Sequence, residues 1–322
     1  MSQKKKDEIQ FDHNHDGIDR RGFLKCMAWA GTGTLCVMQG GVLKSYSLSQ
    51  LGQLGAKQAS GELSFVQISD SHMGFSKAAN QDVAETLKAA VAKINALPVA
   101  PEFLLHTGDI SHLSKPEEFD AVDQILKTAK ARDVFFVPGE HDVLSDNGEI
   151  YHERYGKQTR GDGWYSFDKN GVHFVGLVNV MNLKAGGLGA LGSAQLEWIK
   201  SDLQECSSST PIVVFAHIPL WSVYPQWGWG TEDAEQALGY LKRFGSVTVL
   251  NGHIHQTMQK IEGNVRFHTA ASTAFPQPAP GTADSPGPMK VPAEKLKSVL
   301  GITEVDFVRG KQALAVVDSN LE

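Results

Sequence analysis

"DVFFVPGEHDV", residues 133–143, joins an apolar run to a glycine, an acid, a histidine and a second acid. Val134, Phe135, Phe136 and Val137 are β-branched or aromatic, which is typical of a buried strand. The polar residues follow where such a strand would end. Two other segments, "FVQISDSH" and "LLHTGD", also pass from an apolar run to an acid. The chain therefore places ionisable side chains repeatedly at predicted strand ends.

Strand-like runs of this kind alternate with amphipathic segments from about residue 62 onward. The predicted strands are "LSFVQISD", "EFLLHTGD", "DVFFVPGEHD", "GVHFVGLVN", "TPIVVFAHIPL", "SVTVLNGHIH" and "NVRFHTAAS". Apolar residues recur at helical spacing in 82–97, 116–131, 193–206 and 232–245. Pro116 and Ser193 are start signals for two of these helices. The alternation predicts an α/β fold with sheets covered by helices.

The ends of five predicted strands carry metal-binding residue types. In open α/β sheets the loops after the carboxyl ends of strands meet in one crevice, so these side chains are expected to converge. In "DSH" and "HIH", residues two apart point the same way if the backbone is extended, so each pair could bind one metal. A lone D-x-H is more often a hydrogen-bonded histidine, but five segments in order favour a metal centre. Imidazole and carboxylate donors suit iron, manganese or zinc rather than calcium. The residues are Asp70, His72, Asp109, Glu140, His141, His217, His253 and His255.

The ordered series D-x-H, G-D, G-x-H-D, H and G-H-x-H resembles the calcineurin-like metallophosphoesterases over residues 62 to about 275. The resemblance implies a four-layer αββα sandwich, in which two packed β-sheets are flanked by helices. It also implies a metal-dependent phosphoesterase that hydrolyses phosphate mono- or diesters through a dinuclear centre and a bridging hydroxide. Two metals can polarise the water and hold the attacking and leaving oxygens in line. A small phosphate ester is therefore the expected substrate.

The resemblance also implies a role for each site residue. Asp70, His72 and His255 correspond to ligands of the first metal, and Asp109 to the bridging carboxylate. Glu140, His217 and His253 correspond to ligands of the second metal. His141 corresponds to the residue that stabilises the transition state or protonates the leaving alkoxide.

Two positions depart from the family pattern. Glu140 stands where members usually carry asparagine, and it adds a negative charge beside the second metal. His112 stands where many members carry an aspartate that orients the catalytic histidine, and we expect Asp142 to take over that task. The first departure leaves open a catalytically silent metal-binding scaffold or interaction protein on the same fold. The complete ligand set and His141 favour the enzyme.

Residues 1–59 are predicted to be a signal segment and linker. Arg20 and Arg21 precede "FLK" and a glycine-diluted apolar run, which resembles a twin-arginine export signal. A membrane anchor or an ordinary amphipathic helix are the alternatives, but the run is shorter than the ~20 apolar residues that span a bilayer. We therefore expect a periplasmic or cell-envelope protein, the twin-arginine translocation machinery as a partner, and no stable transmembrane segment in the mature chain.

Residues 60–322 are predicted to form one domain, with a proline-rich loop at about 275–292. The net charge of −6 is not gathered into a basic stripe, so no nucleic-acid groove is expected. Four aromatic residues follow His217 in a loop and could stack on a flat substrate or pack against one another: Trp221, Tyr224, Trp227 and Trp229. Three histidines inside predicted strands are expected to be packed core residues: His106, His173 and His268.

Overall fold

The structure is a computed structural model that describes residues 34–39, 42–47, 62–308 and 314–322. The chain divides into two compact units, Met1–Ser60 and Gly61–Glu322. In the first unit, β1 (Thr34–Gln39) pairs antiparallel with β2 (Val42–Ser47). Arg20 and Arg21 lie outside the described residues. Among the residues described, none of the helices has the length and apolar content needed to span a bilayer.

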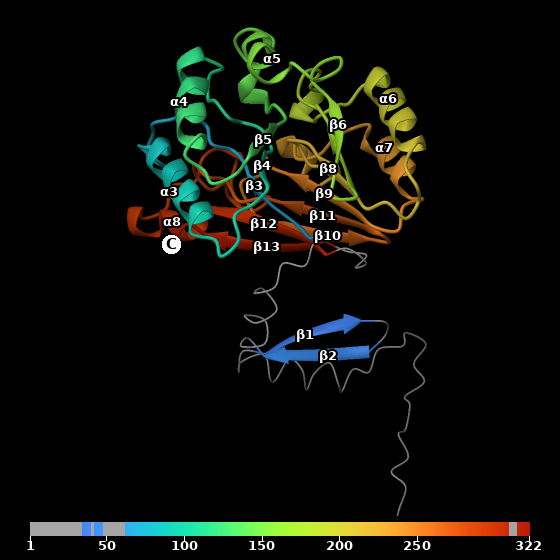
Figure 1. Cartoon of the computed structure of the whole chain (residues 1–322). Coiled ribbons are helices and arrows are strands. Elements are labelled where there is room, and N and C mark those ends of the chain that lie inside the picture. The colour runs from blue at the N-terminus through green and yellow to red at the C-terminus, as the bar shows by residue number, and fades with distance from the viewer. Residues whose placement is uncertain (1–33, 40–41, 48–61, 309–313) are drawn as a thin grey trace, which may run out of the picture. The chain divides into compact units, whose positions relative to one another are not determined.

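The second unit contains two mixed β-sheets (Figure 1). The five-stranded sheet has the order β13-β12-β3-β4-β5, with β3 (Glu62–Ile68), β4 (Phe103–His106), β5 (Asp133–Phe136), β12 (Gly301–Val308) and β13 (Ala315–Asn320). The six-stranded sheet has the order β10-β11-β9-β8-β7-β6, with β6 (Tyr165–Lys169), β7 (Val172–Gly176), β8 (Ile212–Phe215), β9 (Val247–Asn251), β10 (Met258–Glu262) and β11 (Val265–Thr269). The strands that precede the predicted site residues run parallel within each sheet.

Residue alternation in β3 shows how the sheets pack. Leu63 and Phe65 point into the core between the two sheets, where they meet Phe174 and Phe215 of the other sheet. The intervening side chains face the helices instead. Because both faces of the strand are covered, β3 carries buried apolar residues on both faces, although Glu62, Ser64 and Gln67 are polar.

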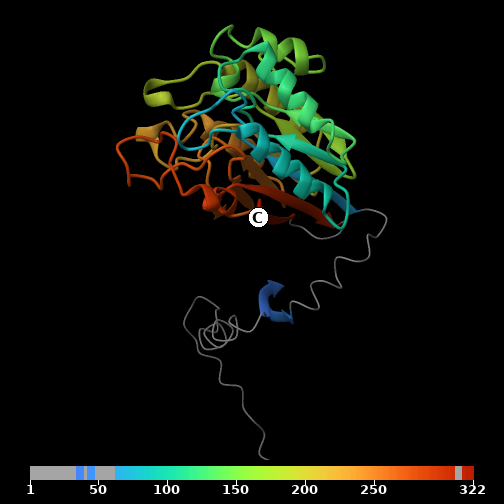
Figure 2. The ribbon, with the colours of Figure 1, turned by 90° about the vertical axis from the view of Figure 1, so that its left-hand side faces the viewer.

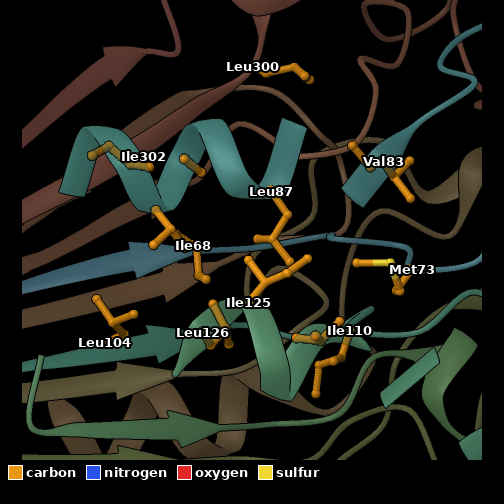
Figure 3. Packing of buried hydrophobic residues seen from close by; sticks show 14 of the residues in the cluster. Ile68, Met73, Val83, Leu87, Leu104, Ile110, Ile125, Leu126, Leu300 and Ile302 are labelled. Atoms are coloured by element: carbon orange, nitrogen blue, oxygen red, sulfur yellow. The ribbon is translucent and has the colours of Figure 1, made fainter. Parts of the chain in front are cut away.

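Helices cover the outer face of each sheet. The helices α3 (Val83–Asn95) and α4 (Pro116–Leu126) pack on the five-stranded sheet, as Figure 2 shows from their side. Leu87 of α3 and Ile125 of α4 meet Ile68 and Leu104 of the sheet (Figure 3). The helices α6 (Ser193–Gln204) and α7 (Ala234–Leu241) cover the other sheet. The predicted αββα sandwich is confirmed.

Helix starts agree with the sequence signals. Pro116 and Ser193 are the first residues of α4 and α6, and the Asp82 side chain caps α3 by accepting from the Glu85 amide at 3.0 Å. The remaining helical elements are short: α5 (Glu149–Tyr155), α8 (Leu296–Val299), η2 (Glu140–Asp142), η3 (Ala185–Gly187), η4 (Pro225–Trp227) and η5 (Ala293–Lys295).

The two sheets are joined by polar contacts at the carboxyl ends of their parallel strands. The buried Gln67 side chain of β3 donates to the main-chain oxygen of Asn251 in β9 at 3.0 Å. The side-chain amide of Asn251 donates in turn to the main-chain oxygen of Ala216, just after β8, at 2.9 Å. These contacts hold the strand ends of both sheets together, so the loops that follow them share one space.

Candidate metal centre

The loops after β3 and β4 run side by side and set out the first site residues. The main-chain amide of Asp70 donates to the Gly108 carbonyl at 3.0 Å, and that of His72 donates to the Asp109 carbonyl at 2.9 Å. Asp70 and His72 have left-handed backbone angles, with φ of 54° and 41°. The expectation of an extended D-x-H segment is therefore wrong, although both side chains enter the same site. Left-handed angles at non-glycine residues cost free energy and persist where surrounding contacts hold them.

Glycines in the motifs provide space for the carboxylates. A Cβ added at Gly139 would overlap the Asp109 carboxylate, and one added at Gly252 would overlap Ser69 and approach Asp70. The amide of His141 can consequently donate to Asp109 Oδ1 at 2.9 Å, and that of His253 to Asp70 Oδ1 at 3.1 Å. These glycines are required because the backbone comes so close to the site acids.

One group of three predicted ligands forms the first half of the centre: Asp70, His72 and His255. Their ligand atoms lie within 4.8 Å of one another. His72 Nε2 is 3.1 Å from His255 Nε2, which is 3.3 Å from Asp70 Oδ1. All three residues are buried.

A second group forms the other half: Glu140, His217 and His253. Glu140 Oε2 is 3.0 Å from His217 Nε2, and Glu140 Oε1 is 3.0 Å from His253 Nδ1. Asp109 joins the halves, because its Oδ2 is 3.4 Å from His72 Nε2 and 3.5 Å from His217 Nε2. The seven residues predicted as metal ligands are thus gathered in one place.

The hydrogen-bond partners of the histidines show that this place suits cations. His217 Nδ1 donates to the Thr107 carbonyl at 2.7 Å, and His255 Nδ1 donates to the Phe275 carbonyl at 2.6 Å. In their neutral forms these rings then direct Nε2 lone pairs at carboxylates. Glu140 Oε2 is buried without a hydrogen bond. Facing lone pairs and carboxylates are the donor set of a divalent or trivalent metal.

The charged and polar groups of the centre also shift one another's pKa values. Burial, followed by the nearby His255, holds the pKa of His72 well below its ordinary value, so His72 is neutral and able to bind a metal. Burial opposes ionisation of Glu140, yet His253 and His217 hold the pKa of that carboxyl well below its usual range. His217 is also buried, but Asp109 and Glu140 raise its pKa well above the ordinary value. Even without a metal, Glu140 and Asp109 therefore stabilise a positive charge in the second half.

His141 is placed beside the ligand cluster by its neighbours. Its Nδ1 donates to the His112 carbonyl at 2.8 Å, and its ring stacks on the His112 ring at 4.8 Å. Although burial favours the neutral ring, Asp109 and Glu140 raise the pKa of His141. A protonated imidazole at this point is suited to act as a general acid.

Asp142 does not orient His141, so that expectation is wrong. Its carboxylate accepts from the amides of Ile110, Ser111 and Gly139 at 3.1, 2.7 and 2.9 Å. Asp142 instead ties the loop after β4 to the loop after β5. Sequence reasoning also missed that the His112 side chain belongs to the centre, where it groups with His72 and His141.

The other histidines of the predicted strands each contact a partner outside the ligand cluster, as expected, although Nδ1 of His106 and Nδ1 of His268 are buried without a hydrogen bond. His106 Nε2 lies 2.7 Å from the Ser71 hydroxyl, and His268 Nε2 lies 2.9 Å from Asp318. His173 lies between Asp168 and Asp202. Each histidine therefore has a structural partner of its own.

The aromatic loop after His217 uses most of its rings for packing. Trp229 is fully buried, and Trp221 packs against Phe267. Tyr224 and Trp227 are half-buried and meet edge to face at 5.0 Å. Trp221, Tyr224 and Trp227 thus keep part of their side chains exposed, whereas Trp229 does not.

Comparison with known proteins agrees with the fold and with the family that the motifs resemble. The sequence profile of the calcineurin-like phosphoesterases matches residues 63–257. A 3',5'-cyclic-nucleotide phosphodiesterase of Nostoc sp. is 25% identical over 219 residues, which are 66% of this chain and 79% of that protein. A serine/threonine-protein phosphatase, CPPED1 of Danio rerio, is 27% identical over 66% of this chain and 76% of its own. A dimetal phosphatase structure from Danio rerio has a TM-score of 0.60 at 15% identity, covering 81% of this chain and 96% of that one.

The αββα sandwich and its carboxylate–histidine cluster define a metal-dependent hydrolase of the dinuclear class. The chain belongs to the calcineurin-like phosphoesterase family, and it is a metal-dependent phosphatase or phosphodiesterase.

Proposed function

We propose that this enzyme hydrolyses phosphate diesters in preference to monoesters. Three carboxylates surround the centre, and in the described part of the chain their ion-pair partners are all histidines. A phosphate monoester carries about two negative charges at neutral pH, whereas a diester carries one. The extra carboxylate of Glu140 therefore opposes the monoester more strongly. The likeness to a cyclic-nucleotide phosphodiesterase supports a diester and the likeness to a protein phosphatase supports a monoester, so the proposal rests on the charge of Glu140.

The observation that supports hydrolysis by two metal ions is the convergence of histidine lone pairs with carboxylates. Asp70, His72 and His255 would hold one ion, Glu140, His217 and His253 would hold the other, and Asp109 would be shared. Bound there, two ions of iron, manganese or zinc would supply Lewis acidity toward the phosphoryl oxygens and the attacking water.

His141 supplies the proton that leaves with the organic group. Its Nδ1–H donates to the His112 carbonyl, so Nε2 is the nitrogen that exchanges a proton with substrate. As the bond between phosphorus and the leaving oxygen breaks, the proton of His141 Nε2 passes to that oxygen. Tyr224 and Trp227 would provide a stacking surface for a flat organic group such as a nucleobase.

Hydrolysis of two related esters tests the proposal. With Mn²⁺ present, kcat/KM for bis(p-nitrophenyl) phosphate should exceed that for p-nitrophenyl phosphate by about tenfold or more, given the charge argument above. A faster monoester would overturn the diester preference. No turnover of either ester, or of 3',5'-cyclic AMP, by protein that holds two metals would identify a catalytically silent scaffold.

We also propose that the chain is exported to the periplasm or cell envelope through the twin-arginine machinery. The support is the Arg20–Arg21 pair ahead of "FLK" and a glycine-diluted apolar run. Replacing both arginines by lysine keeps the charge and removes the planar guanidinium groups. The double variant should remain in the cytoplasm on fractionation. Its normal appearance in the periplasm would rule out this route.

A further inference from the structure

In three histidines of the centre, the ring nitrogen that does not face the site has a main-chain hydrogen-bond partner. For His217, His255 and His141, the Nδ1 atom donates to a main-chain carbonyl at 2.6 to 2.8 Å. A carbonyl only accepts, so each Nδ1 must carry hydrogen and Nε2 must be the nitrogen that faces the site. The neighbouring backbone thus fixes the tautomer of these three rings.

His72 is fixed in a different way. Its Nε2 faces His255 and Asp109, while its Nδ1 lies 3.4 Å from Nδ1 of His112. For Nε2 to bind a metal, the hydrogen of His72 must be on Nδ1. The hydrogen-bond partner of that Nδ1 in the structure is another imidazole, which can either donate or accept. The tautomer of His112 therefore determines whether His72 can serve as a ligand.

His112 is held firmly enough to act in this way. Its amide donates to the Met73 carbonyl at 2.9 Å and to Glu118 Oε2 at 3.1 Å. Its ring stacks on His141 and meets the edge of Phe75 at 5.2 Å. The backbone and both sides of the ring are thus positioned by separate elements, namely the loop after β3, helix α4 and η2.

We propose that His112 is a positioning residue whose Nδ1 lone pair accepts the hydrogen of His72 Nδ1 and thereby fixes His72 as an Nε2 ligand of the first metal. His112 then carries its own hydrogen on Nε2. The inference rests on the proposed role of His72 as a ligand. It makes the retention of one metal depend on a residue that does not bind it.

Two substitutions separate the acceptor from the aromatic ring. His112→Phe keeps a ring that can stack on His141 and Phe75 but removes the acceptor. His112→Asn removes the ring, and its side-chain oxygen can replace the Nδ1 acceptor. The full-length proteins are loaded with Zn²⁺ and dialysed against a series of chelator concentrations, and bound zinc is measured.

We expect His112→Phe to lose one zinc at about 10- to 100-fold lower chelator concentration, because partners behind a metal ligand have effects of this size. His112→Asn should retain zinc within about threefold of the unchanged protein, and the second zinc should behave alike in all three. Retention of both ions by His112→Phe, or equal loss in both variants, would overturn the positioning role. If the unchanged protein bound no zinc, the proposed metal centre itself would be wrong.

Nitrogen NMR of the histidine rings tests the proposal without any substitution. In the zinc-loaded protein, His72 should show hydrogen on Nδ1 and His112 should show it on Nε2. Hydrogen on Nδ1 of His112 would contradict the proposal, whatever the variants do. This measurement also stands if His112→Phe does not fold.

Discussion

The two halves of the metal centre differ in how the fold encloses them. On the first half, the side chains of Asp70 and His255 are 0% and 1% exposed. On the second half, those of Glu140 and His253 are 22% and 12% exposed. The first half is a closed part of the core, whereas the second opens to the solvent from which a substrate must arrive.

This difference in exposure indicates that the two halves have different roles in metal retention and in chemistry. In the first half, the Phe275 carbonyl holds His255 and His112 holds His72, which favours retention of one ion. In the second half, Glu140 places a carboxylate where the family usually has a neutral amide, and His141 lies directly beside it along the chain. We therefore expect chemistry and metal exchange to be concentrated on the second half. The predictions below test this expectation or separate it from effects on both halves and on the scaffold.

The largest effect is expected from His141→Ala. Loss of a general acid should lower turnover by roughly 10²- to 10⁴-fold, while both metals remain bound. The loss should be smaller for esters with good leaving groups, because these need less protonation. Steady-state rates with p-nitrophenyl and alkyl esters, together with metal analysis, measure both effects. Loss of a metal from this variant would make His141 a ligand instead.

A methyl group at Gly139 should disturb both halves at once. In Gly139→Ala the added carbon would overlap the shared Asp109 carboxylate. Displacement of a catalytic group by about 1 Å can cost roughly 10²-fold in rate, and we expect a loss of that order with weaker binding of both metals. Gly239→Ala, in α7, is the control because nothing lies within 4 Å of the added carbon. Selective loss of one metal would show that Asp109 serves only one half.

The sequence predicts which side chains gather in the two halves much better than it predicts what holds them. Asp109 and His217 follow strongly apolar strands and carry chemistry in their own side chains. The acceptors that fix the tautomers of His217 and His255 are the main-chain oxygens of Thr107 and Phe275. A carbonyl is common to all residue types, so no sequence signal marks it. The left-handed backbone angles of Asp70 and His72 also depend on main-chain hydrogen bonds, and these leave no signal in the sequence either.

The fold shows a similar limit. Most central strands were predicted from buried apolar runs, but β12 (Gly301–Val308), which lies between β13 and β3, was missed because Glu304 and Asp306 interrupt its apolar residues. The edge strand β10 (Met258–Glu262) was missed because its residues are mostly exposed. β6 (Tyr165–Lys169) was missed as well, since three of its five residues are polar or charged: Ser166, Asp168 and Lys169. Edge strands are formed through backbone pairing with a neighbour, and that pairing needs little apolar signal.

Glu140→Asn should weaken the second half while leaving the first unchanged. At an effective dielectric of about 20, two unit charges 4 Å apart interact by roughly 4 kcal/mol, so loss of this carboxylate should lower retention of the second ion by about tenfold or more. With less negative charge nearby, the attacking water should ionise more readily, and the acidic limb of the pH–rate profile should move to lower pH. Chelator titration and pH–rate profiles of both proteins measure the two shifts. If neither shift occurs, Glu140 does not act on the metals.

The smallest effect is expected from His173, which tests whether pH acts on the centre or on the scaffold. His173 Nδ1 lies 3.0 Å from Asp168, and its Nε2 lies 2.9 Å from Asp202. Burial disfavours the charged ring, yet hydrogen bonds to these two carboxylates raise its pKa above the ordinary value of about 6.5. A group whose pKa is raised on folding stabilises the fold fully below the pKa of the unfolded chain. That contribution is lost as the pH rises through the pKa of the folded state.

His173→Gln should therefore destabilise the protein at pH 5.5 and have little effect at pH 9. Because Asp168 is 78% exposed, solvent screens the pair, and we expect a loss of only about 0.5–1 kcal/mol. Urea unfolding at the two pH values, with saturating metal, measures the difference. Metal retention and the pH–rate profile should match those of the unchanged protein, which would separate acid sensitivity of the scaffold from that of the second half. An equal loss of stability at both pH values would mean that His173 contributes by packing rather than by charge.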